Sequence, residues 1–112
     1  MRFLALLIAV PFFLNGADVK FAVEVQPILA ERCSGCHAGA RSMGGVRFDK
    51  RTDALAKGKS GESPVVPGDA DASVLLRRVK SADPRKRMPF GQKALSTEQI
   101  ATLEQWIRQG AV

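Results

Sequence analysis

The chain has little of several residue types on which other protein classes depend. Its 112 residues include no tyrosine, one tryptophan, one histidine and two cysteines. Only two residues separate Cys33 from Cys36, so a disulfide between them would close a loop too small to stabilise a fold. The cysteine pair therefore needs a chemical explanation. The length also limits the chain to one domain of ordinary size.

The sequence has no apolar run long enough to cross a membrane. The longest run, residues 3–14, has twelve residues and contains Pro11, whereas a spanning helix needs about 20. Arg2 precedes the run and small residues follow it, which is typical of a secretory signal. An uncleaved anchor is the competing interpretation. We expect residues 1–17 to be a cleaved signal peptide and residues 18–112 to be one exported domain in the bacterial periplasm, with no transmembrane anchor.

Acidic residues are fewer than basic ones. Seventeen Lys and Arg stand against eleven Asp and Glu, and removal of residues 1–17 takes away only one basic residue, which leaves a side-chain balance of +5. Such a surface suits an acidic partner or an anionic membrane face. The absence of tyrosine and of any known binding motif argues against nucleic acid as the partner.

Apolar periodicity predicts a few helices separated by loops. Residues 19–32 follow the i, i+4, i+7, i+8 pattern of an amphipathic helix, and its regular part is expected to begin near Pro27. Asp71 is expected to cap a helix over 72–79, which Asp83-Pro84 ends. The first predicted helix, over residues 19–32, therefore leads directly into the cysteines.

The clearest predicted element is the last helix. Residues 96–99 read Ser-Thr-Glu-Gln, a capping box, and Gly110 stands where a C-terminal glycine belongs. Residues 38–67 are rich in glycine and proline and predict a loop with at most one short helix around 52–57. No strand candidate is visible. The expected fold class is therefore all-α, with a few helices and long loops.

The residues Cys33-Ser34-Gly35-Cys36-His37 form the attachment signature of c-type haem. Thiols at this spacing can add to the vinyl groups on one edge of the porphyrin, and the adjacent histidine supplies the proximal iron ligand. A zinc site would want a fourth ligand, and the chain has no further Cys or His. A thioredoxin-like dithiol would need a βαβ setting. A chance motif in a disulfide-bonded module is the remaining alternative.

The sixth iron ligand has few candidates. His37 is the only histidine, so a second histidine ligand from the same chain is impossible. Met1 belongs to the expected signal peptide, and Met43 lies only six residues beyond His37. Met88, between Arg87 and Pro89, is therefore the expected distal ligand, although a methionine can instead fill a gap in the core.

Four segments of the chain give it a family resemblance. One precedes the haem motif, one follows it, one lies in the middle of the chain and one precedes the last helix. They are Val25-Gln26-Pro27-Ile28-Leu29-Ala30-Glu31-Arg32, Gly44-Gly45-Val46-Arg47-Phe48-Asp49, Val66-Pro67-Gly68-Asp69 and Arg87-Met88-Pro89. The chain resembles the planctomycete-type cytochrome c domain. The resemblance implies a class I-like cytochrome c fold around one covalently bound haem c, with His37 and Met88 as axial ligands.

Two structural expectations accompany the haem. The proximal histidine usually donates its second ring N–H to a backbone carbonyl, and Pro64 and Pro67 are the candidates for that carbonyl. Trp106 is expected to pack against Val25 or Leu29 where the first and last helices cross, or else to donate its indole N–H to a haem propionate.

The expected function is transfer of single electrons, not catalysis. The expected partner is an acidic redox protein or a membrane-bound oxidoreductase, because seven basic residues surround Met88 and complementary charge speeds encounter. A merely solvated basic face is the alternative. Other functions left open are an open-site haem protein, gas-binding or enzymatic, and a haem-bearing interaction module. The seven basic residues that flank Met88 in the sequence are Arg77, Arg78, Lys80, Arg85, Lys86, Arg87 and Lys93.

Overall fold

The computed structural model describes residues 18–112, and the expected signal peptide at 1–17 lies outside the described residues. The first helical segment consists of a wide π-helical turn, η1 (Phe21–Val25), followed directly by α1 (Gln26–Arg32). Pro27 lies in the first turn of α1, so the regular α-helix begins beside it, as predicted. Val25, Ile28 and Leu29 form the buried face.

The last helix, α4 (Thr97–Arg108), has the predicted ends. The Ser96 hydroxyl accepts from the Gln99 backbone N–H at 3.1 Å, and the Gln99 side chain accepts from the Ser96 N–H at 3.0 Å. At the other end Gly110 has a φ of +105°, a conformation that favours glycine. The predicted boundaries of this helix are confirmed because they depend on local sequence alone.

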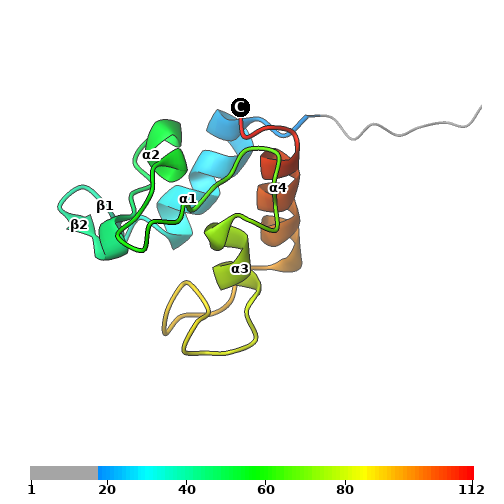
Figure 1. Cartoon of the computed structure of the whole chain (residues 1–112). Helices are drawn as coiled ribbons and strands as arrows, with labels where there is room; N and C mark the ends of the chain where they lie inside the picture. The colour runs from blue at the N-terminus through cyan, green and yellow to red at the C-terminus, as the bar shows by residue number, and fades with distance from the viewer. Residues whose placement is uncertain (1–17) are drawn as a thin grey trace, which may run out of the picture.

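The core lies where η1 and α3 (Val74–Lys80) pack against α4, together with the buried face of α1 (Figure 1). Trp106 is fully buried in it, with its ring centroid 5.3 Å from that of Phe21. Its indole N–H donates to the Val112 carbonyl at 3.1 Å, which argues against the alternative of a propionate partner. Trp106 thus packs against the first helical segment through Phe21, a neighbour that the sequence did not single out. Val25 and Leu29, the expected neighbours, belong to the same buried cluster.

The stretch expected to be loop contains short regular elements. β1 (His37–Ala38) and β2 (Arg41–Ser42) form an antiparallel two-stranded sheet, followed by the 3₁₀ turn η2 (Met43–Gly45). The expectation of no strand was therefore wrong, since strands of two residues leave no periodicity in a sequence. The short helix predicted around 52–57 is present as α2 (Arg51–Leu55).

The start of α3 differs from the prediction. Asp71 does not cap it; the helix begins after Ser73, which occupies the N-cap position. The Ser73 hydroxyl donates to the Asp69 carbonyl at 2.8 Å and accepts from the Val66 N–H at 2.9 Å. Because of these contacts with the preceding turn, the helix begins two residues later than predicted. Helix propensity alone does not indicate this delay. α3 ends at Lys80, one residue beyond the predicted end at Val79 and ahead of Asp83-Pro84.

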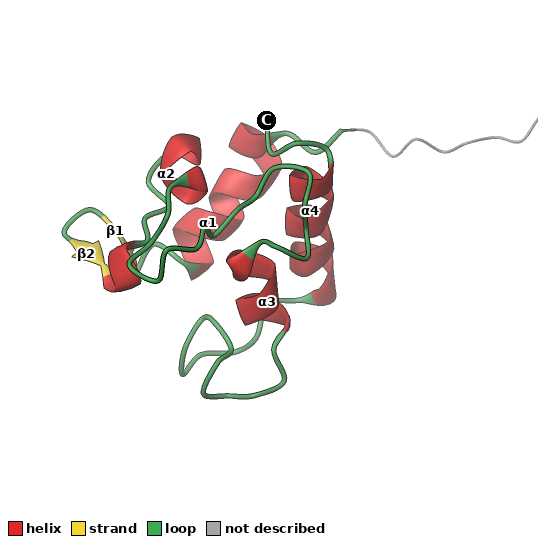
Figure 2. Ribbon diagram, in the orientation of Figure 1, coloured by secondary structure: helices red, strands yellow, loops and turns green. Residues whose placement is uncertain are grey.

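Loops make up most of the rest of the described chain (Figure 2). A long loop, drawn in yellow in Figure 1, leaves the end of α3 and returns to α4. None of the helices within residues 18–112 is both long and apolar enough to span a membrane. The domain is small and mostly helical, as expected, with the short sheet as an addition.

Candidate haem site

The cysteine motif follows α1 without a break. The N–H groups of Cys33 and Ser34 both donate to the Leu29 carbonyl, at 3.0 and 2.9 Å, and the His37 N–H donates to the Cys33 carbonyl at 3.1 Å. Both cysteines are free thiols; Cys33 is half-buried against the core and Cys36 is exposed. The helix end thus presents two unbonded thiols and a histidine within one tight turn.

The Cys33 thiol lies in apolar surroundings. Burial raises its pKa from the ordinary value of 9.0 to about 11, and the neighbouring Arg32 charge opposes this rise. The thiol is therefore uncharged at neutral pH. A thioether also carries no charge, so this position suits the sulfur of a covalent haem link.

The His37 ring is held from two directions. Its Nδ1 lies 3.2 Å from the Val46 carbonyl, and its ring meets that of Phe48 edge-on, with centroids 5.7 Å apart. The Phe48 N–H donates to the His37 carbonyl at 2.7 Å, which ties the two segments together. When Nδ1 carries the proton and donates to Val46, Nε2 has a free lone pair that can bind a metal.

The expectation that Pro64 or Pro67 supplies this carbonyl was wrong. The Pro64 carbonyl instead accepts from the Leu75 N–H in α3 at 2.9 Å. Val46 takes the role because the β1–β2 hairpin turns the chain back, and residues 46–48 then run beside His37. The sequence signal for this was the glycine pair ahead of Val46, which permits the sharp η2 turn: Gly44 and Gly45 have φ values of +66° and +73°.

The two candidate methionines lie in different surroundings. Met43 is 59% exposed, directly after β2. Met88 is half-buried in the loop between α3 and α4, and its N–H donates to the Arg78 carbonyl at the end of α3 at 3.1 Å. No hydrogen bond within residues 18–112 joins Met88 to the cysteine motif. The fold therefore brings Cys33, Cys36 and His37 together, while Met88 is positioned by α3.

Comparison with known proteins identifies the family. A family model described as Planctomycete cytochrome C matches residues 33–89, just over half of the chain. The chain belongs to the planctomycete cytochrome c family. The matched range begins at Cys33 and includes His37 and Met88. The comparisons with curated proteins and with solved structures gave no match.

The family resemblance inferred from the sequence is thus confirmed, and cytochrome c domains of this kind imply covalently bound haem c. The residues present fit that group. Cys33 and Cys36, the chain's only cysteines, are free to form the thioethers, and the Val46 contact leaves His37 Nε2 available for iron. A bound haem would supply one-electron chemistry at its iron.

Sequence reasoning missed the role of Arg32 in this cytochrome domain. Its guanidinium donates to the Gln99 side chain at 3.4 Å and to the Lys93 carbonyl. Arg32 immediately precedes Cys33, and Lys93 lies in the loop that carries Met88. The side chain therefore connects the haem motif with the far end of the Met88 loop. The only available signal was a basic residue at a predicted helix end, which is common for other reasons.

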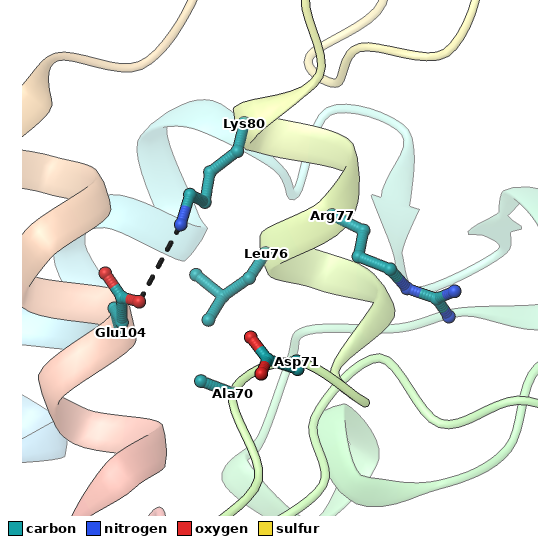
Figure 3. Close-up of a pocket in the computed structure, with 6 residues that line it drawn as sticks. All are labelled: Ala70, Asp71, Leu76, Arg77, Lys80 and Glu104. Atoms are coloured by element: carbon teal, nitrogen blue, oxygen red, sulfur yellow. Dashed lines mark ion pairs between the residues drawn. The ribbon is translucent and has the colours of Figure 1, made fainter.

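The basic residues around Met88 fall into two groups. Those on α3 are partly neutralised: Arg77 lies 2.6 Å from Glu62, and Lys80 lies 3.7 Å from Glu104. Figure 3 shows Lys80 directed toward Glu104 across a shallow pocket of about 350 Å³, while the Arg77 guanidinium points away from these two side chains. The ion pairs found within residues 18–112 involve none of the cations Lys86, Arg87 and Lys93.

Proposed function

We propose that this chain is a monohaem c-type cytochrome that passes single electrons between exported or membrane-bound redox partners in the bacterial periplasm. The observation that carries the proposal is the His37 ring, fixed by the Val46 carbonyl at 3.2 Å beside two free thiols. A fixed ring orientation and a free Nε2 are what a permanent axial ligand requires. Cys33 and Cys36 would hold the haem covalently.

Met88 is the proposed distal ligand. Its backbone is tied to α3, and the loop before it is ordered by Asp83, whose carbonyl accepts from the N–H groups of Lys86 and Arg87 at 3.0 and 2.8 Å. A thioether ligand on the sixth site favours reversible electron transfer over binding of external ligands. This assignment supports electron transfer over the alternative of an open-site haem protein.

The proposed partner is an acidic redox protein that docks on residues 83–93, here termed the basic loop. The Arg85 side chain is 92% exposed and lies 3.8 Å from Asp83. Lys86 and Lys93 are also exposed, and Phe90 is 66% exposed among them. An exposed aromatic ring with cations around it resembles the apolar centre and polar rim of a protein interface. The charges would raise the association rate more than the affinity.

The deciding experiment combines intact mass and a visible spectrum. The chain is produced in cells with a cytochrome c maturation system, alongside a control cytochrome. A mass equal to the polypeptide from residue 18 plus one haem, and a low-spin six-coordinate spectrum in both oxidation states, supports the proposal and the signal cleavage. A polypeptide without haem, while the control cytochrome matures, contradicts it. A five-coordinate spectrum would instead favour the open-site alternative.

A further inference from the structure

The carbonyl that holds His37 is itself supported by a distant part of the chain. The turn at residues 58–62 is closed by hydrogen bonds from the Gly58 N–H to the Glu62 carbonyl and from the Gly61 N–H to the Gly58 carbonyl, both 3.0 Å. The next N–H, that of Lys59, donates to the Gly44 carbonyl at 2.8 Å. The 58–62 turn is therefore joined to the segment that leads into Val46.

Gly58 allows this close approach. A Cβ atom at Gly58 would lie 2.9 Å from Val46 Cγ2 and 3.0 Å from the Gly44 carbonyl oxygen, distances that real Cβ atoms hardly tolerate. Gly58 is not among the glycines with positive φ, so it is not held in the left-handed conformation that favours glycine. The glycine is thus needed at this position for space and not for backbone freedom.

The same segment continues to the helix that positions Met88. The Glu62 carboxylate pairs with Arg77 of α3 at 2.6 Å, and the Pro64 carbonyl accepts from the Leu75 N–H. α3 in turn offers the Arg78 carbonyl to the Met88 N–H at 3.1 Å. One segment, residues 58–64, therefore contacts both the support of the proximal histidine and the helix that holds the methionine loop.

We propose that Gly58 is a positioning residue for His37. Its missing side chain lets the 58–62 turn close on Val46 and hold the Val46 carbonyl at Nδ1. This inference rests on the proposed haem function. A hydrogen bond from Nδ1 makes the opposite nitrogen a better electron donor, which favours ferric iron and keeps the reduction potential lower. Displacing Val46 weakens that bond and raises the potential.

The chain offers a matched control within the same turn. Gly61 has a φ of +83° and open space around its Cα, whereas Gly58 has contacts and no positive φ. Gly61→Ala thus introduces backbone strain without touching Val46, and Gly58→Ala introduces the contact without the strain. Val46→Ala keeps the backbone carbonyl but removes the side chain that faces Gly58. In the variant that combines Gly58→Ala with Val46→Ala, the methyl group added at position 58 would occupy the space that the valine side chain leaves.

The experiment uses the haem-loaded full chain and measures the reduction potential, the solvent exchange of the His37 Nδ1–H in the reduced protein by NMR, and unfolding in urea. Gly58→Ala is expected to raise the potential and to speed the exchange roughly fivefold, the effect of losing one ordinary hydrogen bond. Gly61→Ala is expected to lower stability with neither change. Val46→Ala is expected to act like Gly58→Ala, and the double variant to restore both readouts in part.

Two results would overturn the inference: equal shifts of potential in Gly58→Ala and Gly61→Ala, or unchanged potential and exchange in Gly58→Ala. If Gly58→Ala yields no folded protein, Val46→Ala decides alone, and wild-type values there also overturn it. Failure of the proposed function is distinguishable, because the wild-type chain would then carry no haem and show no reduction potential at all.

Discussion

Arg32 and Gln99, sixty-seven positions apart, meet through a guanidinium-to-amide hydrogen bond of 3.4 Å. Gln99 is also the residue that completes the capping box of α4. The contact therefore joins the end of the helix that leads into the haem motif with the start of the last helix. Because Arg32 also donates to the Lys93 carbonyl, one side chain secures three segments around the proposed haem.

Arg32→Met is expected to lower the free energy of unfolding by about 1–3 kcal/mol, since two hydrogen bonds from a charged group are lost, one of them to the half-buried Gln99. Urea unfolding of the haem-loaded protein measures this. Arg108→Met is the matched control, because Arg108 forms only an exposed i,i+4 pair with Glu104 at 2.8 Å and should cost less than about 0.5 kcal/mol. Equal losses in the two variants would show that Arg32 makes no special link.

Met88→Ala is expected to open the sixth iron site and lower the reduction potential, because a thioether favours ferrous iron. The visible spectrum should become that of five-coordinate or water-ligated haem, and external ligands such as cyanide should bind faster. Met43→Ala, at a residue that is 59% exposed, should leave spectrum and potential unchanged. The opposite pattern in the two variants would reassign the ligand to Met43.

Charge reversal on the basic loop is expected to slow bimolecular electron transfer to an acidic redox protein. The variant combines Arg85→Glu, Lys86→Glu and Lys93→Glu and leaves Arg87, next to the proposed ligand, unchanged. The effect should be largest at low salt, since screening at about 0.15 M acts beyond about 8 Å. Stopped-flow mixing at several salt concentrations measures the rate.

The control for this variant reverses the same amount of charge elsewhere, with Lys20→Glu, Lys50→Glu and Lys57→Glu. These three exposed lysines lie in η1's N-cap position and on either side of α2. If both triple variants slow the reaction equally, net charge and not the basic loop governs the encounter. If neither changes the rate or its salt dependence, the basic loop is only a solvated surface.

Trp106→Ala is expected to cost about 3–5 kcal/mol, because the ring is fully buried against Phe21. Trp106→Phe keeps most of the apolar contact but loses the N–H that donates to the Val112 carbonyl. Loss of this hydrogen bond is expected to lower the free energy of unfolding by about 1 kcal/mol, in addition to the effect of the changed packing. Urea unfolding gives both values. A haem spectrum that stays unchanged in Trp106→Phe would agree with a packing role, and a changed one would favour contact with the haem.

The sequence by itself predicted the parts of the protein that depend on neighbours in the chain. The Cys33–His37 signature depends on covalent spacing, the Ser96–Gln99 box on one helical turn, and Gly110 on its own backbone angle, so no distant residue can alter them. The family followed from the same local segments and was confirmed.

The tertiary structure alone decided which distant groups meet these local elements. Val46 replaced the expected prolines as the partner of His37 because a hairpin of two-residue strands turned the chain back. α3 began after Ser73 and not Asp71, because the Ser73 hydroxyl bonds the preceding turn. Folding also brings Arg32 into contact with Gln99, and Gly58 close to Val46. Such pairings depend on the packing of whole segments, so a local signal, such as the glycine pair ahead of Val46, does not identify the distant partner.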